Sequence, residues 1–286
     1  MFFASKGGPM LVLKRVAGFV AFLGLSAGCA QAADLSGYAA PSYKDAGNYW
    51  VITIGGYGVA EPAFPGSKDY VFTGRPIIDI HQAGAKEWLS LPNDAFSLGL
   101  YQTDNFRVGI AGDYMNHRQQ SDAPSALKGM HNIDYTLQAG AFAEYYPVPF
   151  LRTRVEVLQG LTGAEGLEAN FMADFIYRPA PQWLFTAGPR MQIVSDKYAS
   201  EFFSVTNSEV VPGGVTMPFS AAGGINSAGI DATARYDMTQ NFSLRAFAEW
   251  DRLLGDSADS PLVKQKGSPD QLQFGLGAAY KFNYSW

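Results

Sequence analysis

Three histidines, His81, His117 and His131, are the residues of this sequence best suited to general acid–base chemistry. His117 and His131 bracket one polar segment, and Asp113 and Asp134 stand near them. An aspartate beside a histidine is the pairing that a hydrolytic site would use. The chain, however, has no nucleophile elbow, no HExxH motif and no cluster with metal-ligand spacing. We therefore expect no catalytic residues, no cofactor and no metal, and a protein that is not an enzyme.

A second set of charged residues recurs at alternate positions of several apolar segments, which places the charges on one face of a strand. Six are arginines and seven are acids, so the set nearly neutralises itself. Such residues could line a pore, or they could form an ion-pair network that fills a narrow interior. We favour the network. Its members are Arg107, Asp113, Arg152, Arg154, Glu156, Glu168, Asp174, Arg190, Asp231, Arg235, Arg245, Glu249 and Asp251.

The segments that carry these charges alternate with a period of two, as β-strands do. In the longest, residues 271–286, every even position is apolar or aromatic and every odd position is small or polar. An ordinary strand has about five or six residues. The polar face of a soluble sandwich would be rich in Lys and Glu, whereas this one mixes Arg with acids, amides and glycine. The pattern predicts an all-β fold, an antiparallel transmembrane β-barrel.

The connections between these strands alternate in length. Outer-membrane barrels have short periplasmic turns and longer outer loops, so we expect both termini on the periplasmic side. We also expect residues 271–286 to pair with residues 49–60 and close the barrel. The short turns lie near residues 102–105, 147–149, 179–182 and 238–241, and the long polar stretches near 61–69, 119–129, 195–224 and 255–269.

Eleven strands can be read between residues 48 and 286. Because a single-chain bacterial barrel has an even number of strands, we add a short strand at Lys86–Leu91 and predict about twelve. Ten strands are the alternative if residues 85–102 are irregular. The stretch after Val194 is too long for a bare loop, so we expect projecting strand ends or a segment folded into the barrel mouth.

The first 32 residues have the features of a secretory signal peptide. Three basic residues precede an apolar run over 16–25, and Ala30-Gln31-Ala32 supplies a cleavage site after Ala32. The run is shorter than the roughly 20 residues that a helix needs to span a membrane. The only cysteine, Cys29, lies in this segment, where its lipidation is the alternative to cleavage. We expect a signal peptide over 1–32, a lead-in over 33–47 and a barrel over 48–286.

Composition narrows the class of protein further. Loss of the signal segment, with three basic residues and no acid, would change the net charge from −5 to about −8. An exported acidic protein is a poor candidate for binding nucleic acid. The chain is 14% aromatic and 16% charged, against about 25% charged in ordinary soluble domains. We expect a multi-pass protein of a Gram-negative outer membrane, in contact with lipid and lipopolysaccharide.

The aromatic residues at the carboxyl end predict a role in membrane assembly. They occupy alternate positions, as in the C-terminal signal that the barrel assembly machinery binds by strand addition. The same residues would also face lipid at the membrane interface, and the two roles are compatible. The residues are Tyr280, Phe282, Tyr284 and Trp286.

Two segments near the carboxyl end carry a family resemblance. One begins with Arg252-Leu253-Leu254-Gly255-Asp256 and continues through Gly267-Ser268 and Gln271, and the other is Gly275-Leu276-Gly277-Ala278-Ala279-Tyr280-Lys281-Phe282. Further similarity lies at residues 65–76, 140–145, 188–189 and 203–206. Together they resemble the MipA/OmpV family of MltA-interacting outer-membrane proteins over about residues 45–286. Residues 209–219 and the extension over 283–286 depart from the family pattern.

The resemblance implies a non-enzymatic scaffold that links the outer membrane to peptidoglycan-remodelling enzymes. The implied partners are a murein-degrading lytic transglycosylase and a bifunctional penicillin-binding protein. Other members of the family are described as adhesins or as envelope proteins that respond to osmotic or drug stress. The alternatives to a scaffold are a narrow pore for small solutes and an adhesin that acts through its outer loops, especially residues 196–224.

Overall fold

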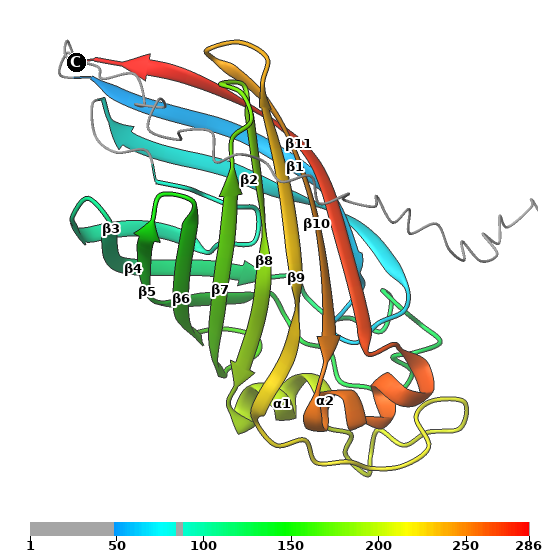
Figure 1. The fold of residues 1–286 in the computed structure, drawn as a ribbon. Helices are drawn as coiled ribbons and strands as arrows, with labels where there is room; N and C mark the ends of the chain where they lie inside the picture. The colour runs from blue at the N-terminus through cyan, green and yellow to red at the C-terminus, as the bar shows by residue number, and fades with distance from the viewer. Residues whose placement is uncertain (1–48, 84–87, 286) are drawn as a thin grey trace, which may run out of the picture. The chain divides into compact units, whose positions relative to one another are not determined.

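The computed structural model describes residues 49–83 and 88–285. This part of the chain forms eleven strands, two short helices and a π-helical turn (Figure 1). The strands are β1 (Trp50–Pro62), β2 (Tyr70–Gln82), β3 (Phe96–Gln102), β4 (Phe106–Met115), β5 (Thr136–Val148), β6 (Leu151–Gly160), β7 (Leu167–Tyr177), β8 (Trp183–Val194), β9 (Gly224–Asp237), β10 (Phe242–Leu253) and β11 (Asp270–Tyr284). The helices are α1 (Asp196–Phe203) and α2 (Gly255–Asp259), and the π-helical turn is Leu262–Lys266.

All eleven strands belong to one antiparallel sheet. Their order is β2-β1-β11-β10-β9-β8-β7-β6-β5-β4-β3. The predicted pairing of the first strand with the last is confirmed, from Trp50 opposite Tyr284 to Ala60 opposite Phe274. None of the helices in the described ranges is both long and apolar enough to cross a membrane.

The burial of the side chains is the reverse of that in a soluble sheet. On β6, Arg152, Arg154 and Glu156 are at most 2% exposed, whereas the intervening Val155 and Val157 are 36% and 39% exposed. Charged groups are buried only where partners and hydrogen bonds compensate the loss of water. An apolar outer face with a polar interior is the arrangement of a barrel that contacts lipid. The period-two pattern therefore places the charges inside the barrel.

The short and the long connections lie at opposite ends of the sheet. The short turns and both described chain ends lie at one end, which in outer-membrane barrels is the periplasmic end. The long connections and both helices lie at the other (Figure 1). The stretch after Val194 folds as α1 followed by an irregular segment, and α1 begins where the Ser195 hydroxyl accepts a hydrogen bond from the Tyr198 backbone N–H.

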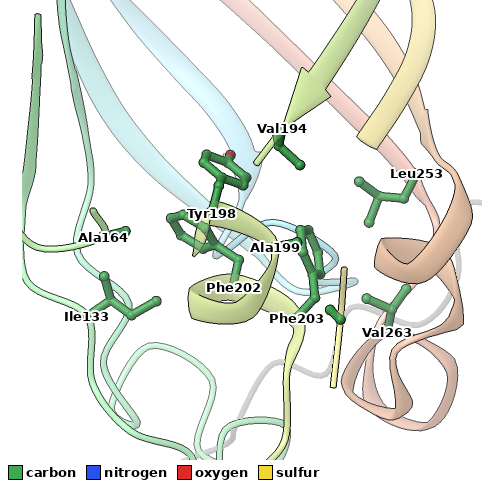
Figure 2. Packing of buried hydrophobic residues seen from close by; sticks show 10 residues of the cluster. Ile133, Ala164, Val194, Tyr198, Ala199, Phe202, Phe203, Leu253 and Val263 are labelled. Carbon is green, nitrogen blue, oxygen red and sulfur yellow. The ribbon is translucent and has the colours of Figure 1, made fainter. Parts of the chain in front are cut away.

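The long connections pack against one another as a lid, which we define as residues 63–69, 116–135, 195–223 and 254–269. Figure 2 shows Phe202 and Phe203 of α1 next to Val263 of the π-helical turn and Ile133 of another connection. A second buried cluster joins Phe64, Leu127, Met130 and Leu262. The lid therefore has a hydrophobic core of its own.

Segments 65–68 and 267–271, which both carry the family resemblance, contact each other in the lid. The backbone N–H of Gly66 donates to Gln271 Oε1 at 2.9 Å, and the backbone N–H of Ser268 donates to the Gly66 carbonyl at 2.9 Å. Gly66 has a φ of 93°, and a Cβ there would lie 2.6 Å from Val263 Cγ2. A residue with a side chain would be strained at this position, so the contact requires glycine.

The strand expected at Lys86–Leu91 is not present over residues 88–91, and residues 86 and 87 lie outside the described part. The described segment 88–95 instead lies inside the barrel. Because every neighbouring pair of the eleven strands is antiparallel, the two edge strands, β2 and β3, run in the same direction. They cannot close the wall by an antiparallel ladder.

Candidate functional site

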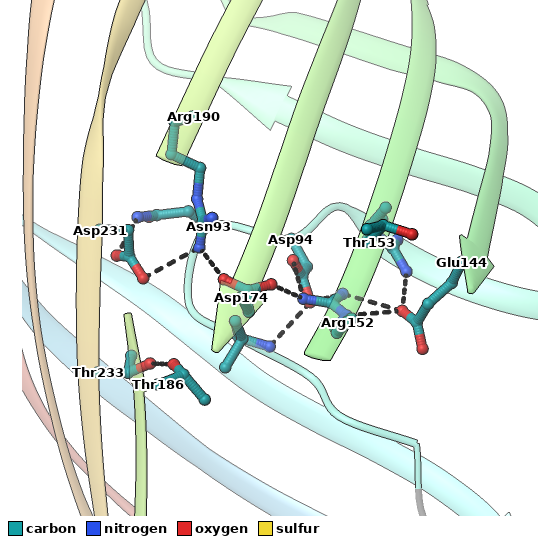
Figure 3. A network of polar contacts seen from close by, with 12 residues as sticks. Asn93, Asp94, Glu144, Arg152, Thr153, Asp174, Thr186, Arg190, Asp231 and Thr233 are labelled. Carbon is teal, nitrogen blue, oxygen red and sulfur yellow. Dashed lines mark hydrogen bonds and ion pairs between the residues drawn. The ribbon is translucent and has the colours of Figure 1, made fainter. Parts of the chain in front are cut away.

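The interior of the barrel is crossed by a network of buried ion pairs with Arg152 at its centre (Figure 3). The Arg152 guanidinium lies 2.6 Å from Asp94 Oδ2, 2.9 Å from Glu144 Oε2 and 2.9 Å from Asp174 Oδ2. Arg152, Glu144 and Asp174 are fully buried. The planar guanidinium has five donors in a rigid fork, which lets one arginine serve three carboxylates.

Two further arginines extend the network along the wall. Arg154 on β6 pairs with Glu144 at 3.0 Å and with Glu156 at 2.6 Å. Arg190 on β8 pairs with Asp174 at 2.6 Å and with Asp231 of β9 at 3.1 Å. The network therefore links β5, β6, β7, β8 and β9 from inside, and each charge has an opposite charge within hydrogen-bonding distance. A buried network is stable only when its members are satisfied in this way.

The segment 88–95, which we call the plug, crosses the interior and bonds to several walls. Asn93 accepts a hydrogen bond from Arg75 of β2 at 2.5 Å and donates one to Glu249 of β10. Asp94 binds Arg152, and the Ala95 backbone N–H donates to Glu156 Oε1 at 3.1 Å. Polar contacts thus hold the plug from opposite sides of the barrel.

The plug divides the interior into two unequal spaces. Between the plug and the lid lies a chamber of about 690 Å³, which is lined by residues of the strands, the plug and the lid. On the other side of the plug, next to Arg235 and Arg245, the cavity measures about 20 Å³. The chamber has the size of a small-molecule site, whereas the cavity next to Arg235 and Arg245 holds little more than a water molecule.

The remaining residues of the predicted network lie on the lumen wall but outside the central cluster. Arg107 stacks over Phe142 at 5.1 Å, and its Nη2 donates to the Ser97 carbonyl at 3.3 Å. Asp113 accepts a hydrogen bond from the Tyr114 backbone N–H at 2.8 Å. The other five follow. Arg235 pairs with Asp237 at 3.3 Å, the Arg245 Nε lies 3.4 Å from Ser243 Oγ, and Glu249 binds Asn93. Glu168 accepts hydrogen bonds from Asn170 at 3.1 Å and Gln192 at 3.3 Å, and Asp251 lines the lumen.

Sequence reasoning missed Asn93 and Asp94, which connect the plug to the wall. Both belong to a segment without periodicity, next to the predicted strand at Lys86–Leu91 that would have belonged to the barrel wall. The only signal in the sequence is Pro92-Asn93-Asp94, a composition typical of a turn. Turns of this composition are common, so the composition does not indicate that the side chains of Asn93 and Asp94 point into the lumen.

The histidines do not form the aspartate–histidine site that their spacing suggested. His131 Nδ1 lies 2.6 Å from Glu209 Oε1, and His117 Nε2 lies 3.7 Å from Asp122 Oδ1. His81 Nδ1 lies 2.8 Å from Asp79 Oδ2. No group of three or more metal-ligating side chains occurs among residues 49–83 and 88–285. Two of the three histidines thus belong to the lid.

Arg118 and Glu209 connect the lid segments through polar contacts. The buried Arg118 guanidinium donates to the carbonyls of Phe202 at 2.8 Å and Glu201 at 3.3 Å. Burial lowers the pKa of Arg118 to about 10, which leaves it charged at neutral pH. Burial also disfavours the Glu209 carboxylate, but hydrogen bonds from the backbone N–H groups of Thr206 and His131 outweigh it and lower the pKa of Glu209 to about 2.

The residues of the predicted assembly signal lie at the end of β11 where they are described. Tyr280, Phe282 and Tyr284 are exposed on the outer face of the barrel. Trp286 and the predicted cleavage residues Ala30 and Ala32 lie outside the described residues, as does Cys29. Their roles remain predictions.

Replacement of Arg152 should destabilise the barrel strongly. Arg152→Met leaves Asp94, Glu144 and Asp174 buried around an uncharged side chain, and breaking a buried pair in this way costs about 3–5 kcal/mol. The free energy of unfolding in lipid vesicles, measured by urea titration, checks this. Arg252→Met is the matched control, because its pair with Asp270 is about half exposed and should contribute less than about 1 kcal/mol. Equal losses for the two variants would contradict the central position of Arg152.

The lid should loosen when the pH falls from about 4.5 toward 2. The pKa of Glu209 lies below its ordinary value in the folded lid, so its contribution is complete above about pH 4.5 and is lost as the pH falls through about 2. Hydrogen exchange of the lid amides across this range measures the loss. Glu209→Gln should expose the same amides already at neutral pH. An unchanged exchange profile in that variant would show that Glu209 does not hold the lid.

The chain is similar to several solved outer-membrane proteins at low sequence identity. It is similar to a bacterial polysaccharide outer membrane secretin, with 10% identity over 82% of this chain and 99% of that one and a TM-score of 0.41. It is also similar to an outer membrane channel from Pseudomonas putida F1, with 11% identity over 82% and 96% of the two chains and a TM-score of 0.36. Among curated proteins, none matches the chain.

A protein-family match also covers most of the chain. The family described as MltA-interacting protein MipA matches residues 54–282, from within β1 to within β11. This range contains the plug, the lid and the ion-pair network. The chain therefore belongs to the MipA family, and it is an antiparallel β-barrel protein of the Gram-negative outer membrane.

Proposed function

We propose that this chain is a non-enzymatic scaffold of the outer membrane that binds a murein lytic transglycosylase at the periplasmic rim of its barrel. The plugged lumen is the observation that carries the proposal. A barrel whose interior is crossed by Arg152, Asp94 and Asn93 has little room for solute flow. Its function is therefore better explained by binding at its surfaces. The family description, MltA-interacting protein, supports a transglycosylase as the partner.

The periplasmic rim is the surface that such a partner would reach. The turns over residues 178–182 and 238–241 are largely exposed, and they project from strands whose register the lumen network fixes from inside. A rigid rim binds without the entropy loss of ordering a flexible loop. A penicillin-binding protein, the second partner that the family resemblance implies, would occupy the same end of the barrel.

Carboxylates placed in the rim should weaken binding of the transglycosylase. The double variant Gln182→Glu/Gln240→Glu places a negative charge on each of two exposed turn residues. These carboxylates would lose their hydration when the enzyme binds, so we expect the dissociation constant of the complex to rise at least about tenfold. Biolayer interferometry with the detergent-solubilised barrel and a purified lytic transglycosylase measures it. Ser125→Glu, at an exposed position of the lid, is the matched control and should bind as the native chain does.

Two results would contradict the scaffold proposal. One is failure of the native barrel to bind the enzyme. The other is a loss of binding in Ser125→Glu with no change in the rim variant, which would move the contact to the outer face.

A narrow pore is the second candidate function, because the chamber of about 690 Å³ occupies the outer half of the lumen. The plug makes conduction the less favoured of the two. We expect no conductance steps from the native barrel in planar lipid bilayers. Asn93→Ala/Asp94→Ala removes the contacts to Arg75, Glu249 and Arg152 and should produce intermittent steps as the plug leaves its place. Steady conductance by the native barrel would favour the pore.

A further inference from the structure

In the described part of the chain, the barrel wall has a gap between β2 and β3, and the chamber extends to it. Within the described residues, each of these strands has a single neighbour, β1 for β2 and β4 for β3. The chamber is lined by Ile78 of β2 and Phe96 of β3, and the outward side chains of these two residues are 51% and 43% exposed. Residues that face both lipid and the chamber mark an opening in the wall.

A hydrogen bond between β4 and β2 borders the gap on its outer side. The Tyr114 hydroxyl donates to the Gly74 carbonyl at 3.2 Å. This carbonyl points to the free edge of β2, and backbone groups two residues apart on a strand face the same side. The nitrogen of Pro76 therefore also faces the free edge, and it has no hydrogen to donate. A proline at this place interrupts any ladder that another strand would form on β2.

The ends of the chamber are covered by protein. Phe64, Arg118 and Phe202 of the lid are buried and border the outer end. The plug borders the other end, and beyond it the cavity measures about 20 Å³. The gap between β2 and β3, at the level of Ile78 and Phe96, thus faces the lipid-contacting side of the wall.

We propose that this gap is a lateral entrance through which an uncharged amphipathic molecule dissolved in the membrane reaches the chamber. Ile78 and Phe96 give the entrance an apolar rim, which an ion in hydrocarbon would pass only at a large desolvation penalty. The charges of the central network are paired with one another, and the chamber wall also carries amides that can meet a polar end. Such amides line the chamber at Asn170, Gln192, Asn226 and Gln273. The volume of about 690 Å³ suits a molecule of drug-like size.

This inference is independent of the scaffold proposal, because the entrance lies in the membrane wall and the scaffold acts at the periplasmic rim. A barrel that binds its enzyme partner normally can still fail the test below, and the reverse also holds.

Trp88 is a reporter inside the chamber. It lines the cavity and packs against Tyr146 with a distance of 5.6 Å between ring centroids. Replacement of the other four tryptophans by Phe leaves Trp88 as the only one. The barrel is reconstituted in lipid vesicles and titrated with the methyl ester of a doxyl-labelled stearic acid, an uncharged amphiphile that quenches tryptophan fluorescence. We expect saturable quenching of Trp88.

Blocking the entrance should abolish this quenching. In a Cys29→Ser background, Ile78→Cys is labelled with a bulky maleimide at the rim of the gap. Ile54→Cys is the matched control, because Ile54 lies opposite Ile78 on β1 and is 52% exposed, against 51% for Ile78. The label at Ile54→Cys should leave Trp88 quenching unchanged. A second reporter chain with Trp250 as its only tryptophan, on the lipid-facing side of β10, should be quenched in every case.

Three results would overturn the proposal. The first is a Trp88 that the ester does not quench in the unlabelled barrel. The second is quenching that survives the label at Ile78→Cys, since the quencher then acts through the wall or enters elsewhere. The third is stronger quenching by the free doxyl-labelled acid than by its methyl ester, which would assign the chamber to an anion.

Discussion

The fold depends on the requirement that Arg152 be neutralised inside the barrel. Its guanidinium is completely buried and serves three carboxylates that come from β5, from β7 and from the plug. An unpaired charge at this depth would be prohibitively unfavourable, so the position of each partner is restricted. The plug is part of this arrangement because Asp94 supplies one of the three charges. The charges of the wall and of the plug therefore neutralise one another, and removal of either would leave a buried charge of the other without its partner.

The lid is stabilised by a different force. Its segments come from four separate connections, and their aromatic and aliphatic side chains form buried clusters around Phe202 and Leu262. Burial of apolar surface is roughly proportional to area and has no direction, so it can join segments far apart in sequence. Arg118 then fixes their relative positions by donating to carbonyls of α1. The outer end of this barrel is consequently a packed layer, in contrast to the free loops of many outer-membrane proteins.

The strands were predictable from the sequence because a period of two is a local property. The alternation in β6 and β11 identified the lumen face residue by residue, and the order of short and long turns indicated that the first and last strands pair. The plug was not predictable, because Asn93 and Asp94 point inward only by virtue of contacts with Arg75 and Arg152 on other strands. The lid core was missed for the same reason. Its hydrophobic residues have no period, and their partners are distant in the chain.

The pairing of β1 with β11 has a consequence for the order in which the chain acquires its structure. Strands from opposite ends of the polypeptide meet within the sheet, while the free edges belong to two strands that follow each other in sequence. A circularly permuted chain that began at β3 and ended at β2 would have only consecutive strands as neighbours. The natural chain must instead bring Trp50 to Tyr284 over nearly its whole length. This one long-range step has the largest loop-closure entropy of the fold, and we expect it to limit the rate of assembly.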